Sequence, residues 1–225
     1  MDFWNDFIEA VHWFIEPGQN VVVTPARPPG SWQAASLAVS STFPKLCRLL
    51  SAAHLTELTI DDRPRLLFSW PVVDAIPAWL CAPPSETPPA NLCAVHRLLL
   101  SAFGGIIERA DEPDSWLLNH NDALTVREAA HDAAFLRDYA WMFPGERVPL
   151  ETADYYSIAR EANGNTTLCH RATGDVVLFA PDHAFDHVRC WRGLPEYTLY
   201  ELNGAPGFVE FVEQIAAQWL KVVRA

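Results

Sequence analysis

The sequence predicts an α+β fold in which helices come first and an antiparallel sheet, packed by a C-terminal helix, follows. Two observations carry this prediction. Apolar residues recur at helical spacing through the first two thirds and at the end of the chain, whereas residues 155–202 contain short β-branched and aromatic runs separated by turns. Half of the 225 residues are hydrophobic and nine are tryptophans, so the chain can bury a substantial core.

Five segments show the apolar spacing of an amphipathic helix. Proline and glycine residues that follow three of these segments set their ends. The pair Gly104-Gly105 is interpreted as a helix C-cap, because a left-handed backbone favours glycine. Thr125 and Glu128 have the spacing of a capping box at the start of another helix. The predicted helices cover residues 3–15, 43–53, 91–102, 125–143 and 206–222.

The strands are predicted from runs of β-forming residues that turn signals separate. An early hairpin joins two runs through the turn Asp61-Asp62-Arg63-Pro64. The pairs Asn163-Gly164 and Thr173-Gly174 separate three later runs, which is typical of an antiparallel meander. The predicted strands cover residues 20–26, 55–60, 65–70, 116–119, 155–161, 166–171, 175–180 and 197–202.

The segment 82–90 is the best candidate for a boundary within the chain. It holds four prolines in nine residues, which excludes a helix or a central strand there. Residues 91–225 are therefore predicted to form one α+β domain. Residues 1–85 are predicted to form a helix and hairpin elaboration, either as part of that domain or as a unit of its own.

The charge of the chain limits its partners. Sixteen basic and 28 acidic residues give a net charge of −12. Such a surface repels phosphates and anionic lipids, so we expect neither nucleic acid nor a membrane as a direct partner. It would instead attract a basic protein surface. The N-terminus is acidic where a signal peptide is basic, and no apolar run reaches about 18 residues, so we expect a soluble, cytoplasmic protein.

The sequence contains no motif of a familiar catalytic or cofactor site. GxSxG, HExxH, GxxxxGK and CxxC are all missing, so we expect neither an enzyme nor a bound cofactor. The adjacent residues Cys169 and His170 lie on a predicted strand and would point to opposite faces. Reduced, buried thiols are the expected state of the five cysteines, which are Cys47, Cys81, Cys93, Cys169 and Cys190.

A histidine cluster leaves open the alternative of a metal-dependent enzyme. His183 and His187 are four residues apart, and a hairpin could bring His170 near them. The preceding residues Asp182 and Asp186 serve more easily as turn residues that bond backbone amides. Because nothing in the sequence requires a third ligand nearby, we interpret the cluster as the polar connection that leaves a buried strand.

Two acidic segments are the candidate partner-binding regions. The first is predicted to be a loop after the glycine pair, and it holds Glu108, Asp111, Glu112 and Asp114. Four like charges in seven positions are stable when they are solvated or paired with a basic group, which favours a contact with a cationic protein. Asp182 and Asp186 form the second, weaker candidate.

Several motifs between residues 91 and 223 occur in a characteristic order: a glycine pair after a helix, a strand with a turn, a second turn before a hydrophobic strand, and a helix rich in phenylalanine. The positions are Gly104-Gly105, Ile158-Ala159, Gly164-Asn165, Thr173-Gly174 with Val176, and Phe208 with Phe211. This order resembles the SUKH superfamily, which includes immunity proteins of bacterial polymorphic toxin systems and fungal cell-wall regulators.

The resemblance implies a non-enzymatic fold that binds and neutralises a cognate protein toxin inside the producing cell. Since the matching positions are structural, the resemblance nominates no site residue. A regulatory or scaffold module with the same fold and no toxin partner is the remaining alternative.

Overall fold

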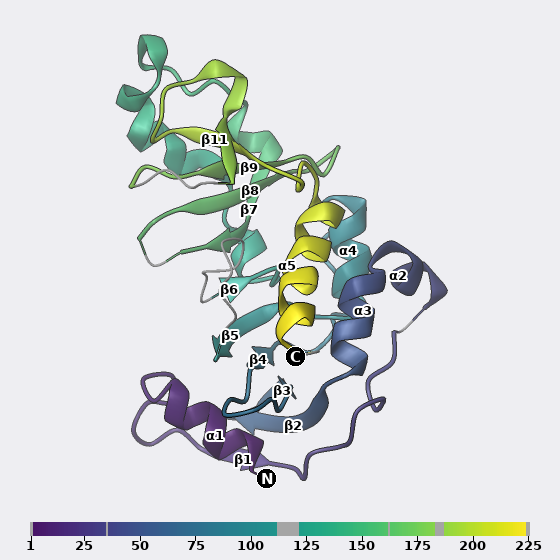
Figure 1. Cartoon of the computed structure of the whole chain (residues 1–225). Helices are drawn as coiled ribbons and strands as arrows, with labels where there is room; N and C mark the ends of the chain where they lie inside the picture. The colour runs from purple at the N-terminus through teal and green to yellow at the C-terminus, as the bar shows by residue number, and fades with distance from the viewer. Residues whose placement is uncertain (1, 35, 112–121, 162, 183–186, 224–225) are drawn as a thin grey trace.

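The computed structural model describes residues 2–34, 36–111, 122–161, 163–182 and 187–223, and it confirms the α+β prediction (Figure 1). Within these residues, eleven strands form one sheet in the order β1-β2-β3-β4-β5-β6-β7-β8-β9-β11-β10. Each neighbouring pair of strands is antiparallel. The sheet therefore follows the order of the chain until its last two strands, which exchange places.

The α-helices are α1 (Phe3–Ala10), α2 (Leu37–Thr42), α3 (Pro44–Ser51), α4 (Ala94–Leu100) and α5 (Phe208–Val223). The 3-10 segments are η1 (Glu128–Ala130), η2 (Ala133–Met142), η3 (Pro144–Glu146), η4 (Thr152–Asp154) and η5 (Trp191–Gly193). The strands are β1 (Val21–Val23), β2 (His54–Ile60), β3 (Arg63–Ser69), β4 (Ala78–Cys81), β5 (Ile106–Ala110), β6 (Asp122–Ala123), β7 (Tyr155–Arg160), β8 (Thr166–His170), β9 (Val176–Phe179), β10 (Val188–Cys190) and β11 (Leu199–Leu202). No helix in the described part of the chain is long and apolar enough to cross a membrane.

The predicted hairpin and meander are confirmed. Ile60 pairs with Arg63 at the end of the β2–β3 ladder, and the two residues between them, Asp61 and Asp62, both have positive φ. Aspartate tolerates this left-handed backbone, which two-residue hairpin turns require. β7, β8 and β9 then pair in sequence, as the later turn signals predict.

The helix predicted over residues 125–143 is wrong as an α-helix. The segment forms two 3-10 pieces, η1 and η2, with His131 in an extended conformation between them. The backbone breaks there because Asp132 makes a bridge with Tyr156 of β7, and the amide of Ser157 donates to the carbonyl of His131. Pairing with the sheet therefore overrides the local helical preference.

The glycine pair is not a helix cap. α4 ends at Leu100 with Ser101 as its C-cap, so Gly104 and Gly105 lie beyond the helix. A Cβ on Gly104 would overlap the carbonyl oxygen of Pro83, and one on Gly105 would lie 2.5 Å from the carbonyl carbon of Leu124. Glycine is needed here because three backbone segments approach one another closely.

The proline-rich segment 82–90 does not interrupt the sheet. β4 before it pairs with β5 after it, and the amide of Ala82 donates to the carbonyl of Gly105 at 3.1 Å. The ladder is thus continuous across the predicted boundary. Whether residues 1–85 fold as a unit of their own stays a prediction.

The C-terminal helix joins the two ends of the chain. Trp219 of α5 packs against Trp70 and Trp79, with ring centroids 5.6 and 4.9 Å away. The Glu213 carboxylate of α5 accepts hydrogen bonds from the backbone amides of Lys45 and Leu46 in the first turn of α3. α5 therefore contributes a tryptophan to the hydrophobic core of the N-terminal half and caps the N-terminus of α3.

β7, β8 and β9 are buried on both faces. Tyr156, Cys169 and Leu178 point to one face, the helix face, where they share a hydrophobic cluster with α4 and α5. Leu168 and Phe179 point to the other, the η2 face, where they share a cluster with η2. This alternation follows the two-residue period of a strand, and it places different chemistry on the two sides of the same ladder.

Candidate functional site

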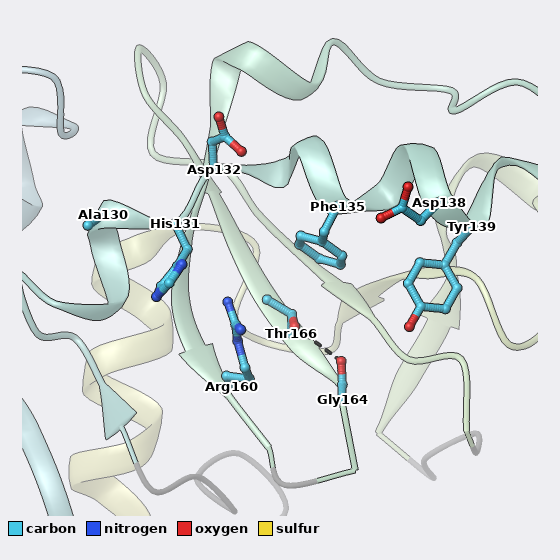
Figure 2. Close-up of a pocket in the computed structure, with 9 residues that line it drawn as sticks. All are labelled: Ala130, His131, Asp132, Phe135, Asp138, Tyr139, Arg160, Gly164 and Thr166. Atoms are coloured by element: carbon cyan, nitrogen blue, oxygen red, sulfur yellow. Dashed lines mark hydrogen bonds between the residues drawn. The ribbon is translucent and has the colours of Figure 1, made fainter.

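A pocket of about 540 Å³ opens on the η2 face, between η2 and the β7–β8 hairpin (Figure 2). We call it the η2 pocket. Its lining residues are Ala130, His131, Asp132, Phe135, Asp138, Tyr139, Arg160, Gly164 and Thr166. Figure 2 shows that Phe135 and Tyr139 point from η2 toward the hairpin, whose Arg160 and Thr166 form the opposite wall.

The aromatic wall is fixed by packing on the sheet. Phe135 and Tyr139 are four residues apart, and both rings contact the buried Phe179 of β9, with centroid distances of 5.7 and 5.0 Å. Asp132 holds the start of η2, because its Oδ1 accepts a hydrogen bond from the amide of Ala134 at 2.9 Å. The two rings therefore form a preorganised apolar surface at the pocket.

A buried carboxylate sets the position of the cationic side chain in the pocket. Glu128 accepts a hydrogen bond from the Ser157 hydroxyl, and its Oε1 lies 3.3 Å from Nε of Arg160. Thr125 Oγ1 in turn accepts the amide of Glu128 at 3.0 Å, which is one of the two hydrogen bonds of the predicted capping box. Arg160 is thus compensated by an acidic partner beneath the pocket.

Two further carboxylates remain at the pocket, those of Asp132 and Asp138, and both residues are exposed. Together with the faces of Phe135 and Tyr139, they suit a cationic group, since aromatic faces and carboxylates both attract positive charge. The pocket is large enough for a lysine or arginine side chain. Its chemistry is that of a recognition site for a basic group.

The predicted acidic loop is wrong at its first residue. Glu108 lies in the middle of β5 and is only 5% exposed, so it offers a partner almost no surface. Asp111 is exposed, but its carboxylate accepts the amide of Ile76 at 3.0 Å, and its φ is positive. It therefore stabilises a turn next to β5. Glu112 and Asp114 lie outside the described residues.

The residues of the second acidic segment are only partly described. Asp182 is exposed beyond β9, and Asp186 lies outside the described residues. His187 is exposed ahead of β10, and His183 is also outside the described part. Asp182 as a partner contact stays a prediction.

His170 has a local role in the β8–β9 turn. Its Nδ1 accepts hydrogen bonds from the backbone amides of Ala172 and Thr173, at 3.3 and 3.2 Å. Among the residues that the structure describes, no three histidine, cysteine or acidic side chains are grouped as metal ligands would be. Since His183 lies outside those residues, the three-histidine hypothesis stays a prediction.

The sequence predicts no pocket at η2. The available signal was weak: Phe135, Asp138 and Tyr139 have the spacing of one helical face, which equally indicates a core-facing stripe. The SUKH-like motif order remains the basis of the family resemblance. In comparisons with known proteins, the chain matches no protein-family model, no curated protein and no solved structure.

Proposed function

We propose that this protein is a non-enzymatic binding protein that captures a basic protein partner, and more specifically an immunity protein that neutralises a cognate toxin. The observation that carries the proposal is the η2 pocket, whose lining includes two exposed aspartates and two aromatic rings. The net charge of −12 supports a basic partner, and the SUKH-like motif order supports the immunity role.

The pocket receives a lysine or arginine side chain of the partner. The aliphatic stem or guanidinium plane lies on Phe135 and Tyr139, and the charged end pairs with Asp138 at the opening. A cation over an aromatic face contributes about 0.5–2 kcal/mol, and more as water is excluded. Trp141, in the same η2 segment, is 70% exposed and supplies a large apolar contact of the kind that dominates protein interfaces.

Neutralisation then requires only that the bound protein covers the active or substrate-binding surface of the toxin. A toxin that acts on nucleic acid carries a basic surface for its substrate, and an acidic protein competes for that surface. Electrostatic attraction accelerates such an association, and salt slows it. We therefore expect binding that weakens steeply as ionic strength rises.

The pocket can be tested without knowing the partner. N-acetyl-arginine amide presents the guanidinium without a charged backbone, and NMR titration should shift the amide signals of residues 130–139 in the wild type. Asp138→Lys should reduce the affinity at least tenfold, and it leaves the Asp132 cap of η2 in place. Glu86→Lys makes the same change in net charge at an exposed position outside the pocket and should leave the affinity within twofold. Equal losses in both variants would attribute the binding to net charge and contradict the pocket.

The biological role needs a second experiment. The protein is co-expressed in a bacterial host with a large toxin gene that neighbours its own gene. Wild-type protein should restore growth, whereas Asp138→Lys should fail although it folds. If growth is not restored by the wild type while N-acetyl-arginine amide still binds, the immunity role is wrong and a basic-protein scaffold remains. Rescue by Asp138→Lys would instead place the contact surface elsewhere, with Asp182 or residues 111–114 as the next positions to change.

A further inference from the structure

A buried chain of polar side chains connects the start of α4 to the helix face of β7 and β8. Cys93 Sγ lies 3.2 Å from Tyr156 Oη, which lies 3.0 Å from Nδ1 of His96. Cys169 Sγ of β8 lies 3.7 Å from Cys93 Sγ. Both cysteines are buried, with exposed fractions of 2% and 0%. Four reactive or titratable groups thus meet in the core, and partner binding at the η2 pocket uses none of them.

The protons that these side chains carry determine which group donates and which accepts in each of the buried hydrogen bonds. His96 Nε2 must carry a proton, because its neighbour at 3.0 Å is the carbonyl oxygen of Leu124, which can only accept. Burial lowers the pKa of His96 to about 4, so the ring is neutral and Nδ1 accepts. Tyr156 therefore donates to His96, and the Cys93 thiol can donate to the tyrosine oxygen.

The surroundings make Cys93 the more acidic of the two thiols. Hydrogen bonds from the Cys169 thiol and from the amides of His96 and Val95 lower the pKa of Cys93, against the opposing effect of burial. The contact with Cys93 and burial both raise the pKa of Cys169. One thiol is thus poised to become the nucleophile while the other keeps its proton, an asymmetry that reactive cysteine pairs use.

We propose that Cys93 and Cys169 form an oxidation-sensitive thiol pair that a peroxide converts reversibly into a disulfide. The sulfur atoms need to approach from 3.7 Å to about 2.0 Å, a small movement for a helix start and a strand already in contact. This inference goes beyond partner binding and does not depend on it.

The reaction proceeds in two steps. The Cys93 thiolate attacks one oxygen of hydrogen peroxide, the O–O bond breaks, and the hydroxide that leaves takes up the proton that Cys93 released. The product is a sulfenic acid on Cys93. Cys169 then attacks this sulfur, the S–O bond breaks, and the hydroxyl leaves as water with the proton of Cys169. Two thiols are oxidised and one peroxide is reduced to two waters.

Arg171 links the segments that precede Cys93 and Tyr156. Its guanidinium lies 5.1 Å from the centre of the Tyr156 ring. The same side chain donates to the carbonyl of Asn91, two residues before Cys93, at 2.9 Å, and to the carbonyl of Ala153 at 3.1 Å. Arg171 therefore links the turn before α4 to the segment before β7. We infer that these bonds cover the thiol pair against a small oxidant, so their loss should speed the oxidation.

The test uses the full chain. The reduced protein is treated with hydrogen peroxide, free thiols are blocked with N-ethylmaleimide under denaturing conditions, and the peptides are identified by mass spectrometry. We expect a Cys93–Cys169 linked peptide, alkylated Cys47 and Cys81, a higher Tm and full reversal by dithiothreitol. Cys93→Ser and Cys169→Ala should each abolish the linkage and the rise in Tm, whereas Cys190→Ser, at the half-buried cysteine, should change neither.

Two results would overturn the proposal. One is oxidation of Cys190 or Cys47 by peroxide while Cys93 and Cys169 remain free thiols, which N-ethylmaleimide then alkylates. The other is stable sulfinic acid on Cys93 without any linkage to Cys169. Arg171→Gln adds a kinetic readout that does not depend on substituting a core residue: linkage should form at least threefold faster, and an unchanged rate would contradict the covering role of Arg171.

Discussion

The two faces of β7–β9 are covered in different ways, and the difference explains where this molecule is open. On the helix face, α4 and α5 seal the strands, and Tyr156 and Cys169 are completely buried. On the η2 face, a 3-10 segment covers the same strands, and its Phe135 and Tyr139 stay half-buried. A 3-10 turn stacks its side chains every three residues and packs less evenly than an α-helix. The less complete cover leaves the η2 pocket.

The polar groups differ in the same way. The helix face buries a neutral histidine, His96, whose two ring nitrogens are both hydrogen-bonded. The η2 face instead holds a carboxylate, Glu128, against the guanidinium of Arg160, whose side chain is 42% exposed. Charge is thus kept on the side that water reaches, where its burial costs less. Packing on the helix face serves stability, and in the proposed function the η2 face makes the contact with the partner.

The largest effect should come from the two adjacent core residues of β9. Phe179→Ala removes the ring under Phe135 and Tyr139 and should lower the free energy of unfolding by about 3–5 kcal/mol. Leu178→Ala, on the helix face, should lower it by about 2–5 kcal/mol. Chemical denaturation measures both.

The two variants should differ in function, because only Phe179 supports the η2 pocket. Phe179→Ala should weaken the binding of N-acetyl-arginine amide, whereas Leu178→Ala should not. If Phe179→Ala does not fold, the milder Phe179→Leu provides the same contrast. Equal binding losses at the two positions would mean that the faces are coupled and would break the comparison.

Acid should destabilise the helix face through His96. Burial keeps its pKa at about 4 in the folded protein, against 6.5 in the unfolded chain. Between these values the unfolded state binds more protons, so stability present at pH 7 is lost as the pH falls, by about 3 kcal/mol in total. Denaturation curves between pH 7 and pH 4 should show this loss in the wild type and much less of it in His96→Gln. His12→Gln, at an exposed position, is the control.

The smallest effect should come from the charge on the η2 face. Glu128→Gln keeps the volume but removes the charge that faces Arg160 and weakens the bond from Ser157, which should cost about 1–2 kcal/mol. The exposed Glu196→Gln should cost nothing measurable in the same denaturation experiment. A loss as large as that of Phe179→Ala would show that charge, and not packing, holds the η2 face together.

The sequence predicts structure best where the residue types themselves determine the backbone conformation, as in tight turns. The turn at Asp61-Asp62 and the pair Asn163-Gly164 mark their hairpins because few residues accept such conformations. β5 was missed because Glu108 and Arg109 are charged, and charged residues in a short run indicate a loop unless their burial is known. The end of η1 depends on a bridge to a strand 24 residues later, which no local pattern contains.

The candidate sites lay beyond the sequence for a related reason. The η2 pocket joins residues 130–139 to residues 160–166, and its openness depends on how η2 packs over Phe179. Cys93 and Cys169 are 76 positions apart, and each alone is an ordinary buried cysteine. Their proximity follows from the order of the strands, which sequence periodicity does not give.

The near-sequential order of the sheet has a consequence for synthesis of the chain. Most strands can pair with the strand made just before them, so the ladder can grow while the ribosome is still translating, since local contacts form quickly. The helices that cover the ladder cannot pack fully at that stage, because two contacts come from α5. Trp219 packs on Trp70 in the core of the first third, and Glu213 caps the start of α3. The nascent chain thus exposes Trp70 and Trp79 until α5 has left the ribosome, which is the interval in which a chaperone would be needed.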